Sequence, residues 1–337
     1  MDRQQIINSI NSKISSSSKI ILTIDGRLDA DAVGSALALA IKFQELGKEI
    51  EVISDTPLRF PYTEFTRAQI IKTVDILNYV PTNPDLVIVT DTSNPQKLIS
   101  ENRPKMPIKW INDLFVIQID HHGDGNFGNL SLVDSSANST TQLVLELLKP
   151  LGITPEIATL LYAGLVADTI NFRTIETNAK TFATAKELMS SGADHTKVRY
   201  WLESYAFEAL NVIGKLIQRV QLSPTFSYVL LTVPYEFCIK YETTSIDNAM
   251  EILKDDLLWR VRETDFVVTL KEPKPGFTKG SLRGNKNPHV DLRVIARALG
   301  GGGHPQGCGF KIEAPIEQAQ KLITKVITEE YSHMTII

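Results

Sequence analysis

Four short acidic motifs between residues 29 and 168 carry the side chains best suited to chemistry. They are Asp29-Ala30-Asp31, Asp91-Thr92-Ser93, Asp120-His121-His122 and Asp168-Thr169. Carboxylates gathered at one place repel one another, so they need a compensating cation or must take up protons. Oxygen ligands together with one or two imidazoles suit Mn²⁺ or Mg²⁺, and they also accept Zn²⁺. If the motifs converge in space, they predict a metal site.

The number of acidic side chains favours two ions over one. At least five carboxylates and a histidine exceed what a single ion requires; the acidic candidates are Asp25, Asp29, Asp31, Asp91 and Asp168. Two ions that share a bridging carboxylate activate a hydroxide and take up charge on a phosphorus centre. We therefore expect two divalent ions, with Mn²⁺ favoured and Mg²⁺ as the alternative.

The elements around these motifs predict how they meet. Apolar runs over residues 20–24, 86–90 and 115–119 end at Asp25, Asp91 and Asp120. Such runs are typical of parallel strands that are buried on both faces. A helical pattern from Val33 to Leu46 and a further strand over residues 49–54 follow the first run. Alternating strands and helices predict a doubly wound α/β sheet, in which the loops after the strands gather at one edge.

The order of the motifs resembles that of a known family. Asp-x-Asp-x-x-Gly-Ser from Asp29, then Asp-Thr-Ser, Asp-His-His and Asp-Thr, is similar to the DHH phosphoesterases, and Gly-Gly-Gly-His at residues 301–304 resembles their DHHA1 domain. The small nanoRNase and pAp phosphatase type of oligoribonuclease is the most similar kind. The resemblance implies an α/β fold with an N-terminal, mainly parallel DHH domain, a smaller C-terminal α/β domain (DHHA1), and an active site in the cleft between them.

The resemblance also implies a role for each motif residue. Asp29 resembles the ligand of the first metal and Asp31 a ligand of the second. Asp91 resembles the bridging carboxylate. His121 and Asp168 resemble further ligands of the second metal, and His122 resembles the histidine that faces the scissile phosphate. Asp120 is expected to orient His121, because metal-bound imidazoles are held by an outer acceptor.

The chain departs from the family pattern at one place. The family usually has a histidine four residues before the first motif aspartate, as a ligand of the first metal, and this chain has Asp25 there. The usual Asn-Pro before Asp29 is replaced by Arg27-Leu28. A carboxylate is a harder ligand than imidazole, so Asp25 as a ligand would favour Mg²⁺ or Mn²⁺.

The C-terminal part carries candidate substrate-binding residues. Glycines let backbone N–H groups approach an anion closely, and Arg283 offers a planar fork that suits phosphate. In the family, the Arg of a Ser-Leu-Arg segment and the Gly-Gly-Gly-His loop hold the nucleotide end of the substrate. The residues here that match are Ser281, Arg283, Gly301, Gly302, Gly303 and His304.

The domain organisation is predicted from composition and pattern. We expect a DHH catalytic domain over residues 1–190, a helical linker over 191–222 and a DHHA1 domain over 223–337. The helical spacing from Val198 to Val220 predicts the connector, and the apolar run Tyr228–Val233 predicts a strand that opens the second domain.

Composition sets the remaining bounds. The 337 residues carry a net charge of −4, which excludes a broad basic surface for long nucleic acids and favours short oligonucleotides or nucleotide phosphates. Two cysteines make no disulfide framework, and neither an apolar signal core nor a membrane-length apolar run is present. We expect a cytoplasmic protein without a membrane partner, and a homodimer is left open.

These observations together predict a metal-dependent phosphoesterase. It would hydrolyse short oligonucleotides to mononucleotides, with 3′-phosphoadenosine 5′-phosphate as a further candidate substrate. Three alternatives stay open: a phosphodiesterase for cyclic or linear dinucleotides, an inorganic pyrophosphatase, and a nucleotide-binding pseudoenzyme whose first metal site is lost through Asp25. The Gly-Gly-Gly-His motif disfavours the pyrophosphatase, because those enzymes resemble a different C-terminal domain.

Overall fold

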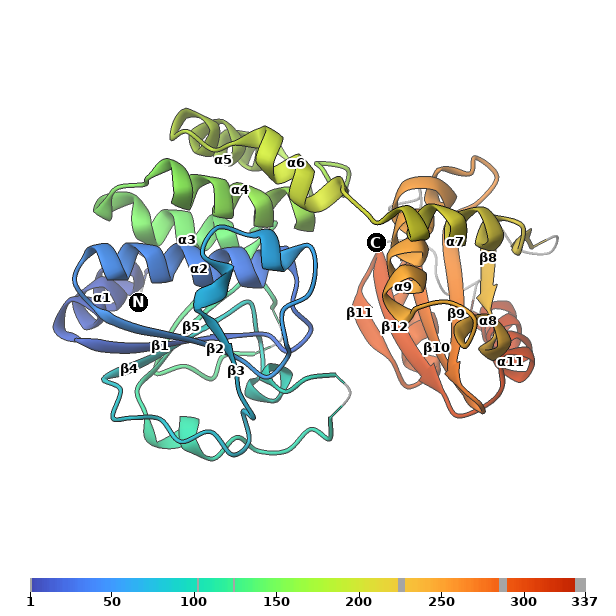
Figure 1. Ribbon diagram of the computed structural model, residues 1–337, viewed down its shortest axis with the longest axis horizontal. Helices are drawn as coiled ribbons and strands as arrows, with labels where there is room; N and C mark the ends of the chain where they lie inside the picture. The colour runs from blue at the N-terminus through green and yellow to red at the C-terminus, as the bar shows by residue number, and fades with distance from the viewer. Residues whose placement is uncertain (1, 102, 124, 224–227, 285–289, 331–337) are drawn as a thin grey trace. The chain divides into compact units, whose positions relative to one another are not determined.

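The chain divides into two compact units between Ser204 and Tyr205 (Figure 1). The computed structural model describes residues 2–101, 103–123, 125–223, 228–284 and 290–330, without the side chain of His304. Each unit contains one sheet with helices packed against it.

The first unit is built on six parallel strands in the order β3-β2-β1-β4-β5-β6. Their bounds are β1 Lys19–Ile24, β2 Glu49–Ser54, β3 Ile71–Thr73, β4 Leu86–Thr90, β5 Val116–Asp120 and β6 Leu130–Val133. Strand order reverses direction between the neighbours β1 and β4, as in doubly wound sheets, where ligands bind beyond the carboxyl ends of the strands at this reversal. The predicted fold class is confirmed.

The two faces of this sheet are covered differently. Helices lie on one side of the sheet (Figure 1): α1 Arg3–Ser16, α2 Ala30–Glu45 and α3 Thr140–Leu148 pack against its strands. Helices α4 Pro155–Asp168, α5 Ala179–Ser190 and α6 His195–Glu203 form a further layer, in which α4 packs against α2 and α3. On β1, Ile20 and Leu22 belong to the helical core, whereas Ile21 belongs to the core of the opposite face. Short 3₁₀ turns contribute to that opposite core, including η3 Pro95–Leu98 and η4 Trp110–Asp113. The strands are therefore buried on both faces, as their apolar runs predict.

Helices α2 and α4 approach each other closely through two glycines. A Cβ on Gly34 would lie 2.6 Å from the carbonyl oxygen of Leu160, and one on Gly164 would lie 2.7 Å from Oδ1 of Asp31. Neither position has room for a larger side chain. This close approach brings the end of α4, with Asp168, next to the first turn of α2, with Asp31.

The second unit contains a mixed sheet in the order β11-β12-β10-β9-β8-β7. Among its described strands, β8 and β9 pair in parallel and the other neighbours pair antiparallel. Its strands are β7 Val220–Leu222, β8 Tyr228–Val233, β9 Phe266–Lys274, β10 Phe277–Gly284, β11 Gly302–His304 and β12 Gly307–Ile312. The helices are α7 Phe207–Ile217, α8 Tyr235–Cys238, α9 Thr243–Ile252, α10 Arg293–Ala298 and α11 Ile316–Glu330. One core lies with α7 and α9, and another with α10 and α11.

The segment Val198–Val220, whose helical spacing predicts the connector, contains parts of two helices. Helix α6 ends at Glu203, the backbone is extended at Ser204 and Ala206, and α7 begins at Phe207. The apolar residues of the two helices belong to different cores: Trp201 is buried in the first unit and Val212 in the second. The same periodic pattern of apolar residues runs through both helices. Such a pattern predicts that one face of a helix is buried, but not which core it packs against.

Two further features bear on the sequence-based expectations. No described helix combines the length and apolar character needed to cross a membrane. Among the described residues, neither Cys238 nor Cys308 forms a disulfide, and Cys308 is buried.

Candidate metal centre

The candidate site lies at the carboxyl ends of the central strands. Asp25 directly follows β1, Asp91 directly follows β4, and Asp120 is the last residue of β5. These strands are neighbours in the parallel sheet, so the three carboxylates leave the sheet at one edge. All three are buried.

Two helices bring the remaining acidic residues to the same edge. Asp31 lies in the first turn of α2 and is fully buried, and Asp168 is the last residue of α4. Ligand atoms of Asp31, Asp168 and His121 lie within 4.8 Å of one another. The small volume of Gly164 leaves room for the Asp31 carboxylate.

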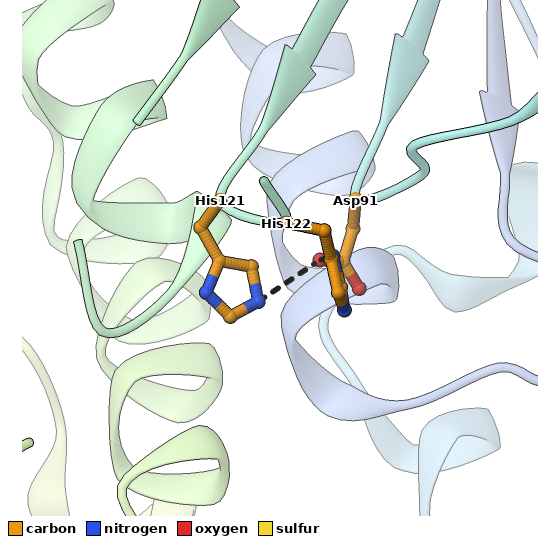
Figure 2. A group of neighbouring side chains, drawn as sticks. All are labelled: Asp91, His121 and His122. Carbon is orange, nitrogen blue, oxygen red and sulfur yellow. Dashed lines mark ion pairs between the residues drawn. The ribbon is translucent and has the colours of Figure 1, made fainter. Parts of the chain in front are cut away.

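His121 approaches two of these carboxylates, and Figure 2 shows its pairing with Asp91. Its Nε2 is 3.5 Å from Oδ1 of Asp91 and 3.3 Å from Oδ2 of Asp168. Its Nδ1 is 3.4 Å from the carbonyl oxygen of Ala137, which can only accept a hydrogen bond. The proton therefore belongs on Nδ1, which leaves the Nε2 lone pair for a metal ion. Burial lowers the pKa of His121, which also favours the neutral imidazole that metals bind.

Asp120 orients His122, so the prediction that it orients His121 is wrong. Oδ1 of Asp120 is 2.8 Å from Nδ1 of His122 and also accepts the His122 backbone N–H at 3.1 Å. Side chains alternate along an extended chain, so residues 120 and 122 share a side while His121 points the other way. Within the described part of the chain, the buried Oδ2 of Asp120 has no hydrogen-bond partner. A buried carboxylate oxygen without a donor favours positive charge nearby.

Asp31 is fixed by the start of α3. Its carboxylate accepts the backbone N–H groups of Thr140 at 2.5 Å and Thr141 at 2.8 Å. These are among the N–H groups that have no partner within a helix, and the helix N-terminus favours an anion. The Thr140 hydroxyl also donates to Oδ1 of Asp91 at 2.9 Å. Helix α3 therefore holds two candidate ligands in place at once.

Burial and mutual repulsion raise the pKa of three carboxyls. Burial is the main cause for Asp91, followed by the charges of Asp29 and Asp31. Burial also raises the pKa of Asp168, and the charges of Asp31 and Asp29 add to it. Burial raises the pKa of Asp29. A bound cation would offset this cost of keeping the carboxylates ionised.

The residues predicted to bind the second metal have donor atoms that fit a divalent ion, whereas Asp25 and Asp29, predicted for the first metal, do not. Two overlapping groups have suitable ligand atoms within 4.8 Å of one another: Asp91, His121 and His122, and Asp31, His121 and Asp168. The mixed oxygen and imidazole donors suit Mn²⁺ or Mg²⁺. Among the described residues, neither Asp25 nor Asp29 belongs to such a group.

Asp25 and Asp29 have other partners. Oδ1 of Asp25 accepts the Arg27 backbone N–H at 2.9 Å and lies 3.2 Å from Arg27 Nε, while Oδ2 accepts the Thr92 hydroxyl at 3.1 Å. Asp29 is the N-cap of α2 and accepts the Ala32 N–H at 2.9 Å. Since neither residue belongs to a group of three close ligand atoms among the described residues, the residues expected to hold the first metal do not fit an ion in this arrangement.

The predicted substrate-binding residues lie on β10 and β11, on either side of β12, with Gly301 just before β11. Across β12, Ser281 of β10 pairs with Gly309, which pairs with Gly302 of β11. Two residues along, Arg283 pairs with Gly307, which pairs with His304. A Cβ on Gly307 would lie 2.8 Å from Nη1 of Arg283, so the glycine leaves room for the guanidinium.

Two of these residues already have partners. Arg283 Nε donates to Oδ1 of Asp255 at 2.7 Å. The Gly301 N–H donates to the Ala296 carbonyl at 2.7 Å, where the chain leaves α10. This N–H is engaged at the end of a helix, so it does not serve as the anion donor expected from the glycine run.

Sequence reasoning missed Thr140 and Gly164. The polar run Ser139-Thr140-Thr141 before an apolar segment is a helix-start signal, but only the fold shows that this start lies against Asp31 and Asp91. Gly164 lies within a helical apolar pattern, where a glycine indicates a close approach without naming the neighbour.

Comparison with known proteins identifies both domains of the chain. Residues 19–165 match the DHH family, N-terminal domain, and residues 235–331 match the DHHA1 domain. The chain is similar to the bifunctional oligoribonuclease and PAP phosphatase NrnA of Thermus thermophilus, with 30% identity over 318 residues, 90% of this chain and 87% of the relative. It is 27% identical over 303 residues to the protein of the same name from Bacillus subtilis, covering 87% of this chain and 89% of the relative.

A solved structure shows the same fold. The exopolyphosphatase-related protein of Bacteroides fragilis superposes with a TM-score of 0.83 at 20% identity and covers 98% of both chains. The chain therefore belongs to the DHH family of phosphoester hydrolases and carries a DHHA1 domain after its DHH domain.

Proposed function

We propose that this protein is a metal-dependent phosphoesterase that hydrolyses short oligonucleotides to mononucleotides, with 3′-phosphoadenosine 5′-phosphate as a second substrate. The observation that carries the proposal is the position of His121 Nε2 between the carboxylates of Asp91 and Asp168. The names of the two bacterial relatives support this substrate class.

The proposed ligands are Asp31, Asp91, His121 and Asp168. The preferred ion is Mn²⁺, with Mg²⁺ as the alternative. When bound, a divalent ion would lower the pKa of a water molecule and neutralise charge that develops on phosphorus. The hydrogen bonds from Thr140 orient Asp31 and Asp91 toward this place before substrate arrives.

His122 is the proposed partner of the scissile phosphate. Asp120 is hydrogen-bonded to Nδ1, so Nε2 is the atom that we propose to meet a phosphate oxygen. With a proton on Nε2, this imidazole would donate a hydrogen bond to a phosphate oxygen as negative charge builds up.

Ser281, Arg283 and His304 are the proposed anion-binding residues of the second unit. The strand register aligns Arg283 and His304 across Gly307. A guanidinium binds phosphate oxygens in pairs and positions them. The glycines Gly302 and Gly303 leave backbone accessible at the same edge strand.

A substrate panel with added Mn²⁺ tests the proposal. The panel contains a dinucleotide, a five-nucleotide RNA, 3′-phosphoadenosine 5′-phosphate, a cyclic dinucleotide and pyrophosphate. We expect mononucleotides from the first two, AMP from the third and little product from the others. The control variant Asp113→Asn, which changes an exposed aspartate of the same unit, should keep this turnover. Turnover confined to the cyclic dinucleotide or to pyrophosphate would overturn the substrate assignment.

A further inference from the structure

Arg27 places a positive charge beside Asp25 and Asp29. Among the described residues, these two carboxylates belong to no group of close ligand atoms. Arg27 lies on the loop between β1 and α2, and its Nε is 3.2 Å from Oδ1 of Asp25. The charges of Asp25, Asp29 and Asp91 all act on its guanidinium. These three carboxylates are the ones on which the family pattern would place the first of two ions.

Asp25 is satisfied without an ion. Its Oδ1 faces the backbone N–H and the side chain of Arg27, and its Oδ2 accepts the hydroxyl of Thr92. The Asp25 side chain is only 2% exposed. A buried carboxylate with donors on both oxygens and a guanidinium partner is in a stable arrangement. An ion at Asp25 would compete with Arg27 and Thr92 for its oxygens.

The loop that carries Arg27 is held on both sides. The Gly26 N–H donates to the Lys97 carbonyl at 2.8 Å, and the Thr56 hydroxyl donates to the Gly26 carbonyl at 2.5 Å. A Cβ on Gly26 would lie 2.4 Å from the Ile99 carbonyl oxygen, so only glycine fits. The next residue but one, Leu28, has a φ of 53°, which proline cannot adopt. The turn is therefore built around Arg27-Leu28 and differs from one that an Asn-Pro pair would form.

The charges around the site favour one guanidinium and one divalent ion over two divalent ions. Although burial alone would lower it, the nearby carboxylates hold the pKa of Arg27 above its usual value. The charge of Arg27 also acts on the carboxyl of Asp168, which is one of the proposed metal ligands. A second divalent ion beside this guanidinium would meet like-charge repulsion, which water screens in part because the Arg27 side chain is 45% exposed.

We propose that the Arg27 guanidinium takes the place of the first divalent ion, so that the site binds a single divalent ion through Asp31, Asp91, His121 and Asp168. This inference rests on the proposed metal-dependent function and concerns only the number of ions. Arg27 supplies one positive charge with directed N–H donors, where a metal would supply two charges and open coordination positions.

Manganese stoichiometry of the full chain tests the inference. The variants are Arg27→Asn, the double variant Asp25→His with Arg27→Asn, and Arg67→Asn as the matched control. Arg67 pairs with Glu156 through its Nε at 3.1 Å, and its side chain is 45% exposed, as is that of Arg27. Bound Mn²⁺ is counted after equilibrium dialysis at several free concentrations. Electron paramagnetic resonance then distinguishes isolated Mn²⁺ from an exchange-coupled pair.

We expect one Mn²⁺ per chain and an isolated signal for the wild type and for Arg67→Asn. The double variant should bind two Mn²⁺ with a coupled signal, its second ion at least roughly a hundred-fold tighter than any second ion of the wild type, or about 2.8 kcal/mol. A coupled pair in the active wild type would overturn the inference while leaving the proposed function intact. A folded double variant that still binds one ion would also overturn it. A wild type that binds no Mn²⁺ and turns over no substrate would overturn the proposed function itself.

Discussion

The hydroxyl of Thr140 donates a 2.9 Å hydrogen bond to Oδ1 of Asp91, although the two residues are far apart in the sequence. Both are buried. The same carboxylate oxygen lies 3.5 Å from Nε2 of His121, and the Thr140 N–H donates to Asp31. One residue at the start of α3 therefore fixes the carboxylates of two candidate ligands.

Thr140→Val should weaken Mn²⁺ binding while leaving the fold intact. Valine keeps the shape of threonine but removes the donor to Asp91. A hydrogen bond to a charged group is typically worth ~1.5–3 kcal/mol, so affinity should fall roughly ten- to a hundred-fold. Titration calorimetry with Mn²⁺ checks this, and Thr140→Ser should restore most of the affinity. Equal affinities of the valine variant and the wild type would show that Asp91 needs no orienting donor.

Asp91→Asn should abolish turnover without lowering thermal stability. Asp91 has a φ of 58°, which asparagine tolerates better than most residues. The change removes a charge whose burial beside Asp29 and Asp31 is unfavourable, so the melting temperature of the metal-free protein should stay the same or rise. Thermal melts and single-turnover assays provide the test. Turnover close to that of the wild type at saturating Mn²⁺ would rule out Asp91 as a ligand.

Gly164→Ala should displace the Asp31 carboxylate. The added Cβ would lie 2.7 Å from Asp31 Oδ1 and 2.5 Å from Cγ2 of Thr141. Overpacking of this kind typically costs ~1–3 kcal/mol of stability, and we also expect weaker Mn²⁺ binding. Gly214→Ala in α7 is the control, because nothing lies within 4 Å of its added Cβ. The account of the α2–α4 contact fails if Gly164→Ala binds Mn²⁺ like the wild type.

Arg283→Ala should weaken nucleotide binding and leave metal binding unchanged. The guanidinium lies over Gly307, in register with His304. Loss of its bonds to phosphate should lower kcat/KM roughly ten- to a hundred-fold, as expected for charged hydrogen bonds. Arg293→Ala is the control, since Arg293 is similarly buried and pairs with its own Asp291. A changed Mn²⁺ stoichiometry in Arg283→Ala would contradict the separate roles of the two residue sets.

Much of the fold could be predicted from the sequence, because a parallel sheet leaves a clear signal. Uninterrupted apolar runs mark buried strands, and their ends place Asp25, Asp91 and Asp120 at one edge. The sequence did not predict which side of the chain each side chain takes after the strand ends. This is why Asp120 was expected to contact His121, whereas it contacts His122.

The partners of the candidate ligands could not be predicted either. The helix N-terminus at Thr140 and the glycine at position 164 reach Asp31 only through the packing of α2, α3 and α4. Arg27 was visible as a departure from the family pattern, but its contact with Asp25 depends on the conformation of the turn. Long-range packing and local backbone conformation, and not residue type, decide these contacts.

The most direct test of the central claim is the initial rate of dinucleotide hydrolysis by the full chain, measured with a chelator and again after Mn²⁺ is restored. The proposed ligands Asp31, Asp91, His121 and Asp168 predict that the chelator removes the activity and that Mn²⁺ returns it. A rate that is unchanged by the chelator, or no hydrolysis at any Mn²⁺ concentration, would contradict the account.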